Sequence, residues 1–376
     1  MIRIYKYLSV NLLKIGHIAR KFLWGGVWLI GGSLMLWYPL RWWPGDRLLP
    51  VRLLNYFMPW LLVVLFPSLL VTMLTSRKKL TFVLTAPTIG ISLSLVPQFI
   101  SSTAVPVLAD NRPLKVMSYN VLYKNEDVPA IAAVIRAEQP DIILLQEFIK
   151  PMIPAFNDEL GTLYPNQVAH VIYEPAISQA MISRYPLTAI DSDWLGRIQK
   201  VQVDTPNGSI QVWNIHSTTA LKQYKWQHQQ KELANIAQEV AEFNDPLILG
   251  GDFNTTPQSD NYQLIAQYLH NSHDQAGWGL GFSYPAKEFV LSNYTINWQW
   301  QLLTQRPVKK LFKWAGITRT PIGINYKYIP ISDRPLVRID HIFYNDHFIA
   351  TQATTLKNGG GSDHLPIMAE LHLRRD

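Results

Sequence analysis

With 376 residues, the chain is long enough for one large domain and an accessory region, and the absence of cysteine excludes a disulfide framework, a thiolate metal site and a cysteine nucleophile. The formal net charge of +7 is concentrated near the N-terminus, where residues 1–100 carry 11 Lys and Arg against one acid, whereas the rest of the chain carries 23 against 26. The C-terminal part therefore lacks the basic excess that drives general nucleic-acid binding, which argues against a soluble DNA-processing enzyme.

Three apolar stretches of similar length occupy the first hundred residues, at about 22–40, 53–74 and 80–100. Each is close to the roughly 20 residues that a helix needs to cross a bilayer. Buried helices of a soluble core are the alternative, but basic connectors and aromatic residues such as Tyr38 and Trp42 are typical of a membrane interface. A cleaved signal peptide fits less well, because the leader is long. We therefore predict a membrane anchor over residues 1–104 with three transmembrane helices.

The basic residues beside these stretches predict their orientation, because Lys and Arg favour the cytoplasmic side of a membrane. Five precede the first stretch, three lie between the first and the second, and three lie between the second and the third. With the N-terminus inside, the inner sides hold the larger number, and three crossings carry the C-terminal domain out. The prediction is a multi-pass protein of the plasma (inner) membrane with an extracytoplasmic domain. The lipid bilayer is its expected partner, and no protein partner is predicted.

Strands and helices alternate beyond a predicted linker at 105–113, which indicates an α/β domain at 114–376. Apolar runs typical of strands are expected at 114–121, 141–147, 246–250, 336–344 and 365–373. Asp127 is a suitable cap for a helix that must end before Pro140, and a long helix is expected at 221–243.

A segment at about 286–334 interrupts this pattern. It is rich in Trp and Tyr and carries eight Lys and Arg against two acids. It is interpreted either as a long surface excursion or as an amphipathic element that lies on the bilayer surface.

Polar residues stand at or just after the ends of several apolar runs, and their types suit hydrolysis of a phosphate ester. That reaction needs charge neutralisation on the phosphoryl oxygens, an activated water and a proton for the leaving oxygen. Glu147, which follows the run 142–145, is the best candidate metal ligand, because a carboxylate there is costly without a partner. Oxygen ligands of this kind suit Mg²⁺ or Mn²⁺. The alternative is a strand-end glutamate that faces solvent.

Asp252 and Asn254 lie in a glycine-led turn, GGDFNTTP. The glycines allow the backbone to turn sharply, and the two-residue spacing puts both side chains on the same side of an extended segment. The carboxylate can orient or deprotonate a water, while the neutral amide can donate to phosphate. The alternative is an Asx-turn that only caps the following helix.

Two histidines complete the candidate chemistry. His216 follows an apolar run and either donates a proton or hydrogen-bonds a phosphoryl oxygen, although a lone histidine is often a core residue. His364 directly follows Asp363, so this turn offers a metal ligand beside a base. Asp340 is a candidate to accept a hydrogen bond from His364 and fix its tautomer, with a salt bridge to Arg338 as the alternative.

Eight motifs in order, between about residues 114 and 373, resemble the endonuclease/exonuclease/phosphatase superfamily: SYNVLY, PDIILLQE, QAMISRYPL, VWNIHSTT, LILGGDFNTTP, GLGFSYP, RIDHIF and GSDHLPIMAEL. The superfamily includes deoxyribonuclease-type nucleases, abasic-site endonucleases, inositol phosphatases and neutral sphingomyelinases. The resemblance implies a four-layered α/β sandwich with two mostly antiparallel central sheets and a site at one end. The predicted membrane part is a departure, because most soluble nucleases of the superfamily lack it.

The resemblance also implies a role for each candidate residue. It implies three metal ligands: Asn120, Glu147 and Asp363. It implies five catalytic positions: His216, Asp252, Asn254, Asp340 and His364. It implies three substrate contacts: Asn254, Arg184 and His216. Because all the main catalytic positions are filled, an inactive relative is not expected.

Together these features predict a membrane-anchored, divalent-metal phosphoesterase that acts on a phosphate ester or diphosphate at the outer face of the membrane. The anchor favours a lipid-linked substrate, such as a phospholipid head group or a polyprenyl diphosphate carrier, over nucleic acid. The alternative is a tethered surface nuclease, which the acidic C-terminal part opposes but the basic segment leaves open. A non-catalytic scaffold would predict decayed motifs, and none is found.

Overall fold

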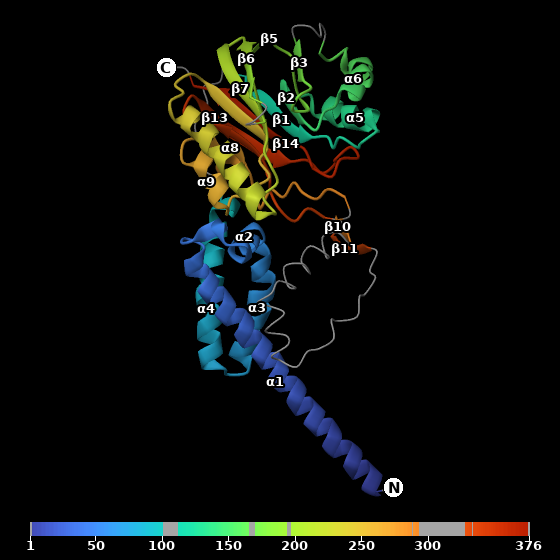
Figure 1. Cartoon of the computed structure of the whole chain (residues 1–376), viewed down its shortest axis with the longest axis vertical. Helices are drawn as coiled ribbons and strands as arrows, with labels where there is room; N and C mark the ends of the chain where they lie inside the picture. Colours follow the sequence, from blue (N-terminus) through green and yellow to red (C-terminus); the bar gives the residue numbers. More distant parts are fainter. Residues whose placement is uncertain are drawn as a thin grey trace.

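The computed structural model describes residues 2–100, 112–164, 170–193, 197–287, 289–292, 328–332 and 334–374. Most of the predicted linker at 105–113, and most of the aromatic and basic segment at 286–334, lie outside these ranges. Within them, the chain forms a group of helices at the N-terminus and a sandwich of two sheets beyond it (Figure 1).

Four α-helices make up the N-terminal part: α1 (Ile2–Leu40), α2 (Leu49–Tyr56), α3 (Met58–Leu74) and α4 (Lys78–Leu95). Short 3₁₀ turns precede α2 and follow α4: η1 (Gly45–Arg47) and η2 (Val96–Phe99). Two described segments, Arg20–Leu40 and Lys78–Phe99, are long and apolar enough to cross a membrane. A third span exists only if α2 and α3 count as one, and these helices are bent by 81° at their junction. The three predicted transmembrane helices are therefore not confirmed.

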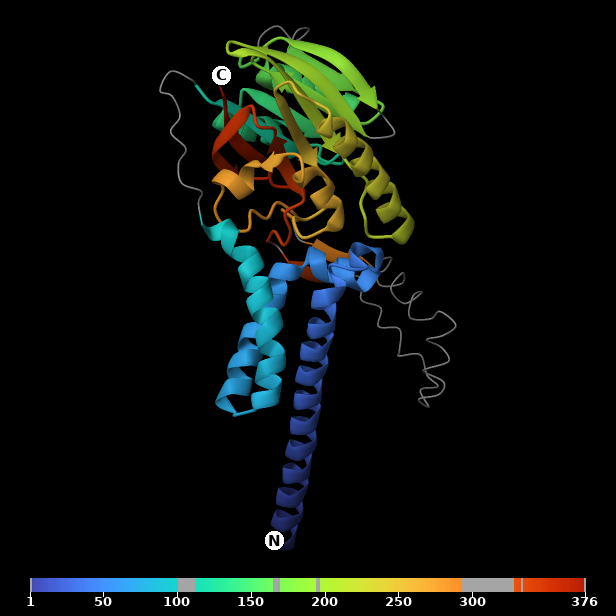
Figure 2. The same ribbon diagram turned by 90° about the vertical axis from the view of Figure 1, so that its left-hand side faces the viewer.

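Pro59 accounts for the break between α2 and α3. It has no N–H to donate to Asn55 four residues earlier, and its ring crowds that carbonyl, so the helix is weakened where α2 would have to continue into α3. A proline is tolerated in the first turn of a helix, which is where it stands in α3. As a result α2 does not continue the axis of α3, and it lies between the other helices and the near end of the sandwich (Figure 2).

The sandwich contains two mixed sheets of six described strands each. The first has the order β13-β14-β1-β2-β4-β3 and the second the order β5-β6-β7-β8-β12-β9. The strands of the first sheet are β1 (Leu114–Asn120), β2 (Ile142–Gln146), β3 (Val171–Glu174), β4 (Gln179–Ser183), β13 (Phe348–Thr355) and β14 (Ile367–Leu373). Those of the second are β5 (Leu187–Asp193), β6 (Ile198–Thr205), β7 (Gly208–His216), β8 (Leu247–Asp252), β9 (His270–Asn271) and β12 (Asp340–Tyr344).

Antiparallel pairing dominates both sheets, as predicted. Among the strands described, β1 with β2 and β7 with β8 are the parallel pairs, and the remaining neighbours in each sheet are antiparallel. A separate antiparallel pair joins β10 (Phe289–Ser292) to β11 (Tyr328–Ser332). The strand β12 begins four residues later than predicted, because Val337 forms an isolated bridge with Tyr284 instead.

Helices cover the outer face of each sheet, which gives four layers (Figure 1). They are α5 (Val128–Glu138) and α6 (Ile153–Leu160) on the first sheet, and α8 (Gln223–Ala241) and α9 (Asp260–Ala266) on the second. A central apolar cluster joins strands of the two sheets through residues such as Leu144 and Val212. Two outer clusters pack beneath the helices, around Ile131 and Leu233. The predicted cap of α5 is confirmed, since Asp127 accepts a hydrogen bond from the Ala130 N–H at 3.0 Å.

Candidate active site

Strand register brings the candidate residues to the end of the sandwich that faces the N-terminal helices. His216 and Asp252 end the parallel strands β7 and β8 side by side, and Asp340 begins β12 opposite Asp252. In the other sheet, Asn120 ends β1 and Glu147 follows its parallel neighbour β2. Parallel strands end at the same edge of a sheet, so these side chains converge. The Asn120 amide joins the sheets, with Nδ2 at 3.2 Å from Glu147 Oε1 and 3.1 Å from Asp252 Oδ2.

The backbone is strained where several of these residues stand. Glu147 and Asn254 have φ of 56° and 49°, a left-handed conformation that residues with a side chain rarely adopt. Gly251 has φ of 147°, and a Cβ at this position would overlap the carbonyl oxygen of Ile215 on β7. Strain of this kind persists only where the surrounding structure imposes it, and it is common at functional sites.

The Asp252 carboxylate is held by three donors. Its Oδ1 accepts from the Asn254 N–H at 2.8 Å, and its Oδ2 accepts from the side-chain amides of Asn254 and Asn120, each at 3.1 Å. This is an Asx-turn, but it does not cap the following helix, because α9 begins only at Asp260 after Ser259. Burial raises the pKa of the Asp252 carboxyl to about 7, even though the nearby His364 lowers it. The turn therefore fixes a carboxylate that can accept a proton near neutral pH.

His216 is held as a neutral donor. Arg197 Nη2 lies 3.0 Å from His216 Nδ1, so Nδ1 accepts this hydrogen bond and the ring proton is on Nε2. Burial, followed by the Arg197 cation, lowers the pKa of His216 well below its usual value. The Nε2 atom lies 3.8 Å from Glu147 and 3.7 Å from Asp252. Of the two roles expected for His216, this geometry favours hydrogen bonding to a phosphoryl oxygen over proton donation.

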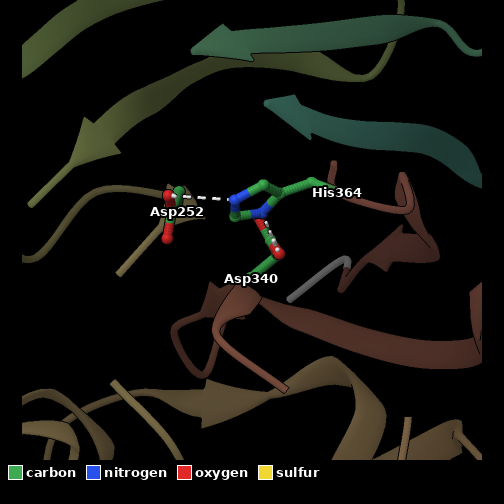
Figure 3. Close-up of side chains that lie close together, drawn as sticks. All are labelled: Asp252, Asp340 and His364. Carbon is green, nitrogen blue, oxygen red and sulfur yellow. Dashed lines mark hydrogen bonds and ion pairs between the residues drawn. The ribbon is translucent and has the colours of Figure 1, made fainter. Parts of the chain in front are cut away.

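His364 carries the opposite charge preference (Figure 3). Its Nδ1 donates to Asp340 Oδ2 at 2.9 Å, and its Nε2 lies 3.9 Å from Asp252 Oδ2. Burial alone would lower the pKa of the ring, but the Asp340 and Asp252 carboxylates together raise it to about 10. Tyr284 packs against the ring with centroids 4.8 Å apart. His364 is thus oriented as a cation beside the carboxylate that accepts a proton.

The site has the oxygen ligands that a divalent cation needs. The carboxylates of Glu147, Asp252 and Asp363 line one cavity, and burial, followed by the repulsion of Glu147, raises the pKa of Asp363. Hard oxygen donors crowded in this way suit Mg²⁺ or Mn²⁺. Asp252, Asp340 and His364 also lie close enough together to hold an ion. However, Asp340 and His364 are already hydrogen-bonded to each other, whereas the Glu147 side chain is 21% exposed. The part of the cavity next to Glu147 and Asp363 therefore suits a cation better.

Two cavities meet at these residues. The first, of about 270 Å³, lies between the sandwich and α2, and its walls combine polar site residues with apolar ones: Leu53, Phe57, Ala220, Leu221, Val337 and Ile339. The second, of about 620 Å³, is lined by Tyr123, Ile149, Arg197, Thr218 and His228. They share Glu147, His216 and Thr219. Tyr123 and His228 are exposed, so the second cavity faces solvent.

Arg184 is not brought to this site, which corrects its predicted phosphate contact. Its Nε lies 3.6 Å from Asp141 Oδ1, just before β2, and Glu147 is at the other end of that strand. Arg184 therefore pairs with a buried aspartate at the far end of the sheet. The expected alternative for Asp340 is also excluded, because Arg338 pairs with Asp274 at 2.6 Å.

Several lining residues were not predicted from the sequence. Arg197 precedes β6 outside any of the eight motifs, and only the fold places it beside His216. Tyr284 lies in the quoted motif GLGFSYP, which was a signal without an assigned role. Arg52, Leu53 and Phe57 come from the predicted membrane anchor, where sequence patterns gave no reason to expect site residues.

Comparison with known proteins gives one family and several similar solved structures. Residues 117–364 match the Endonuclease/Exonuclease/phosphatase family. Among solved structures, an endonuclease/exonuclease/phosphatase from Beutenbergia cavernae is 19% identical with a TM-score of 0.44, over 70% of this chain and 72% of that one. A family protein from Bacteroides thetaiotaomicron is 15% identical with a TM-score of 0.48, over 71% and 100%. A mannosyl-6-phosphatase from the same organism is 15% identical with a TM-score of 0.46, over 69% and 99%. No curated protein gives a significant match.

Proposed function

Since the chain belongs to the endonuclease/exonuclease/phosphatase family and is a hydrolase of phosphate esters, we propose that it is anchored in a membrane and cleaves a lipid-linked phosphate ester or diphosphate. One observation carries the lipid proposal. The cavity that contains Asp252 and His364 is closed on one side by Leu53 on α2 and by Phe57 at the junction of α2 and α3, beside the candidate membrane spans. An apolar wall next to a phosphate-cleaving site suits a substrate with a hydrocarbon part.

Exposed apolar side chains support the membrane anchor. Leu29 on α1, Phe66 on α3 and Phe82 on α4 are 71%, 52% and 74% exposed. Large apolar patches on the surface of a soluble protein are rare, and a bilayer would cover these side chains. Together with the length and hydropathy of two segments, they favour insertion of this part of the chain in a membrane.

A divalent cation, Mg²⁺ or Mn²⁺, is the proposed cofactor. Glu147 and Asp363 are its proposed ligands, and Asn120 would hold Glu147 in place and remains a candidate third ligand. When bound, such a cation neutralises charge on the phosphoryl oxygens and orients the reacting group.

The chain's own residues supply the remaining chemistry in this proposal. Asp252 takes a proton from the attacking water, since it is buried, fixed by three donors and faces the cavity. His216 donates its Nε2 proton in a hydrogen bond to a phosphoryl oxygen. The P–O bond to the leaving group then breaks, and the leaving oxygen departs with the negative charge. His364, oriented by Asp340, stabilises charge that develops on the phosphate side. Asn254 donates to both Ser217 and Asp252, so it positions the carboxylate, and its predicted phosphate contact stays a prediction.

Lipid is favoured over DNA as the substrate by the surroundings of the cavity. A nuclease needs several cations along a groove that admits a polymer backbone. Among the described residues that line the cavity beneath α2, Arg52 is the one lysine or arginine, and α2 forms the wall of the cavity on that side.

The extracytoplasmic location of the sandwich also remains a proposal. The number of candidate spans, two or else three if α2 and α3 count as one, does not determine on which side of the membrane the sandwich lies. The distribution of Lys and Arg favours the outer side. Protease added to intact cells or spheroplasts should digest the sandwich. Protection until the membrane is permeabilised would place it inside.

The function is tested by assaying the full-length protein in detergent micelles. The substrates are a polyprenyl diphosphate, a phospholipid and linear duplex DNA, each with Mg²⁺ and with EDTA. We expect turnover of a lipid phosphate that EDTA abolishes and that Asp252→Asn lowers by at least a hundredfold. Rapid cleavage of DNA with every lipid left intact would reject the lipid proposal and support the tethered nuclease.

A further inference from the structure

An arginine from the N-terminal helices lines the active-site cavity. Arg52 on α2 is only 1% exposed, and it shares the cavity wall with Asp252 and His364. One helical turn further along α2, the Tyr56 hydroxyl donates to the Asn254 carbonyl at 2.6 Å. This bond fixes α2 against the turn that holds Asp252, so the position of Arg52 relative to the site is set by the fold.

One edge of the Arg52 guanidinium has no partner among the residues that the structure describes. Its Nη1 donates to the Asp46 carbonyl at 3.1 Å and lies 3.4 Å from Gln223 Oε1. The guanidinium also lies over the Trp226 ring, 5.4 Å from its centroid. Its Nε and Nη2 are buried without a hydrogen-bond partner in the described part of the chain. Unpaired donors on a buried charge are costly, and they are usually explained by a ligand or by water.

The nearest acid does not satisfy this arginine. Asp46 Oδ1 accepts from the Asn55 side chain at 2.7 Å, and its Oδ2 accepts from the Asp260 N–H at 2.8 Å. Within the described residues no carboxylate lies within ion-pair distance of Arg52. Arg52 therefore brings a cation without a carboxylate partner to the α2 side of the cavity, and the carboxylates line its other side.

We propose that Arg52 binds a second, non-reacting phosphate of the substrate, so that diphosphates are favoured over monophosphates. Nε and Nη2 form one edge of the planar guanidinium, which can bind two oxygens of a phosphate at once. Both atoms are buried in the absence of substrate, so in this proposal the Arg52 side chain turns that edge toward the cavity when the phosphate binds. The reacting phosphate lies with the carboxylates and their proposed cation, and its neighbour is on the Arg52 side. Leu53 and Phe57 continue the same wall with apolar surface for the lipid chain. This inference rests on the proposed function and specifies its substrate class.

A purely structural arginine would behave differently. The Nη1 bond to Gln223 and the contact with Trp226 join α2 to α8, so Arg52 also helps to dock the helices on the sandwich. Loss of docking would lower the turnover of every substrate alike. Loss of a phosphate contact would lower the turnover of diphosphates alone.

The experiment compares three variants of the full-length protein in detergent micelles. Arg52→Met keeps an apolar side chain against Trp226 but removes the charge. Arg52→Lys keeps the charge but cannot donate two parallel hydrogen bonds to one phosphate. Asp260→Ala is the matched control, because it removes the acceptor of the Asp46 N–H, at 2.8 Å, and loosens docking outside the cavity. The value of kcat/KM is measured for a polyprenyl diphosphate and for the monophosphate of the same chain length.

Arg52→Met should lower kcat/KM for the diphosphate on the order of 10- to 100-fold and change that for the monophosphate little. Arg52→Lys should fall between, and Asp260→Ala should affect both substrates equally. Equal effects of Arg52→Met on both substrates, or no effect on either, would overturn the inference.

A binding measurement separates this inference from the proposed function. Calorimetry on Asp252→Asn protein uses methylenediphosphonate, which is not hydrolysed, and methylphosphonate. Adding Arg52→Met should weaken binding of the first on the order of 10- to 100-fold and leave the second unchanged. If the wild-type protein cleaves no lipid, the lipid proposal fails, and this measurement alone decides the role of Arg52. Unchanged binding of methylenediphosphonate would reject that role.

Discussion

Acid should destabilise this protein through His341, and one substitution isolates the effect. His341 follows Asp340 on β12 and is 1% exposed. Its Nε2 donates a hydrogen bond to the Thr255 carbonyl at 2.9 Å, and its Nδ1 accepts a hydrogen bond from the Asn271 side-chain amide at 3.3 Å. The ring is therefore neutral in the native protein. Burial, followed by the Arg338 cation, lowers the pKa of His341 from its ordinary 6.5 to about 3.

The sign of the effect follows from this depressed pKa. As the pH falls below 6.5, His341 becomes protonated in the unfolded chain but stays neutral in the native protein. The free energy of unfolding is therefore highest above this pH and decreases progressively below it. At pH 4.5 the unfolded histidine is about two pH units below its pKa, and the native ring is still neutral. Each unit is worth about 1.4 kcal/mol, so His341 should lower the free energy of unfolding by about 2.7 kcal/mol between pH 7.5 and pH 4.5.

The test compares the wild-type protein with His341→Gln, whose amide can donate to Thr255 and accept from Asn271 without titrating. Denaturant unfolding of the full chain in detergent micelles is followed by tryptophan fluorescence at both pH values. The stability of wild type relative to the variant should fall by about 2.7 kcal/mol on acidification. His270→Gln is the surface control: this β9 histidine is 44% exposed and pairs with Asp346 in solvent, so its substitution should alter the pH dependence less than His341→Gln does. Equal pH dependence of wild type and His341→Gln would refute the reasoning.

Three further predictions address the site. Asp340→Asn removes the carboxylate that orients His364, so kcat should fall about 10- to 100-fold with KM nearly constant in steady-state assays, and an unchanged kcat would remove Asp340 from the mechanism. Glu147→Gln should raise the Mg²⁺ concentration for half-maximal activity about tenfold or more in titrations after EDTA treatment, and an identical titration would place the cation elsewhere. Gly251→Ala puts a Cβ against the Ile215 carbonyl, so denaturant unfolding should show a loss of about 2–5 kcal/mol, whereas a wild-type midpoint would contradict the geometry.

Much of the sandwich could be predicted because its signals are local. Asp127 caps α5 as the sequence indicates, and the run before Glu147 is continuously apolar because β2 lies between two packed layers. Polar residues at strand ends converge because register and parallel pairing are fixed by the buried faces. This explains why the expected proximity of Glu147, Asp252 and His364 agrees with the structure.

The helical part and the rim of the site could not be predicted in the same way. Hydropathy averages over a window, so the run at 53–74 gave one expected span although Pro59 divides it. Once α2 turns away, Arg52 and Leu53 lie on the active site, and no local pattern encodes that long-range packing. Arg184 illustrates the opposite error, because its motif matches the family while its side chain pairs with Asp141.

The junction of the two cavities at Glu147, His216 and Thr219 has a kinetic consequence for the proposed reaction. Cleavage of a P–O bond at this junction would leave the apolar, lipid-containing product in the cavity beside α2 and the water-soluble product in the cavity that faces solvent. Each product then has its own exit, so neither must wait for the other to leave. Two cavities that meet at the site therefore favour product release in random order. Product-inhibition kinetics should then show no obligatory order of release.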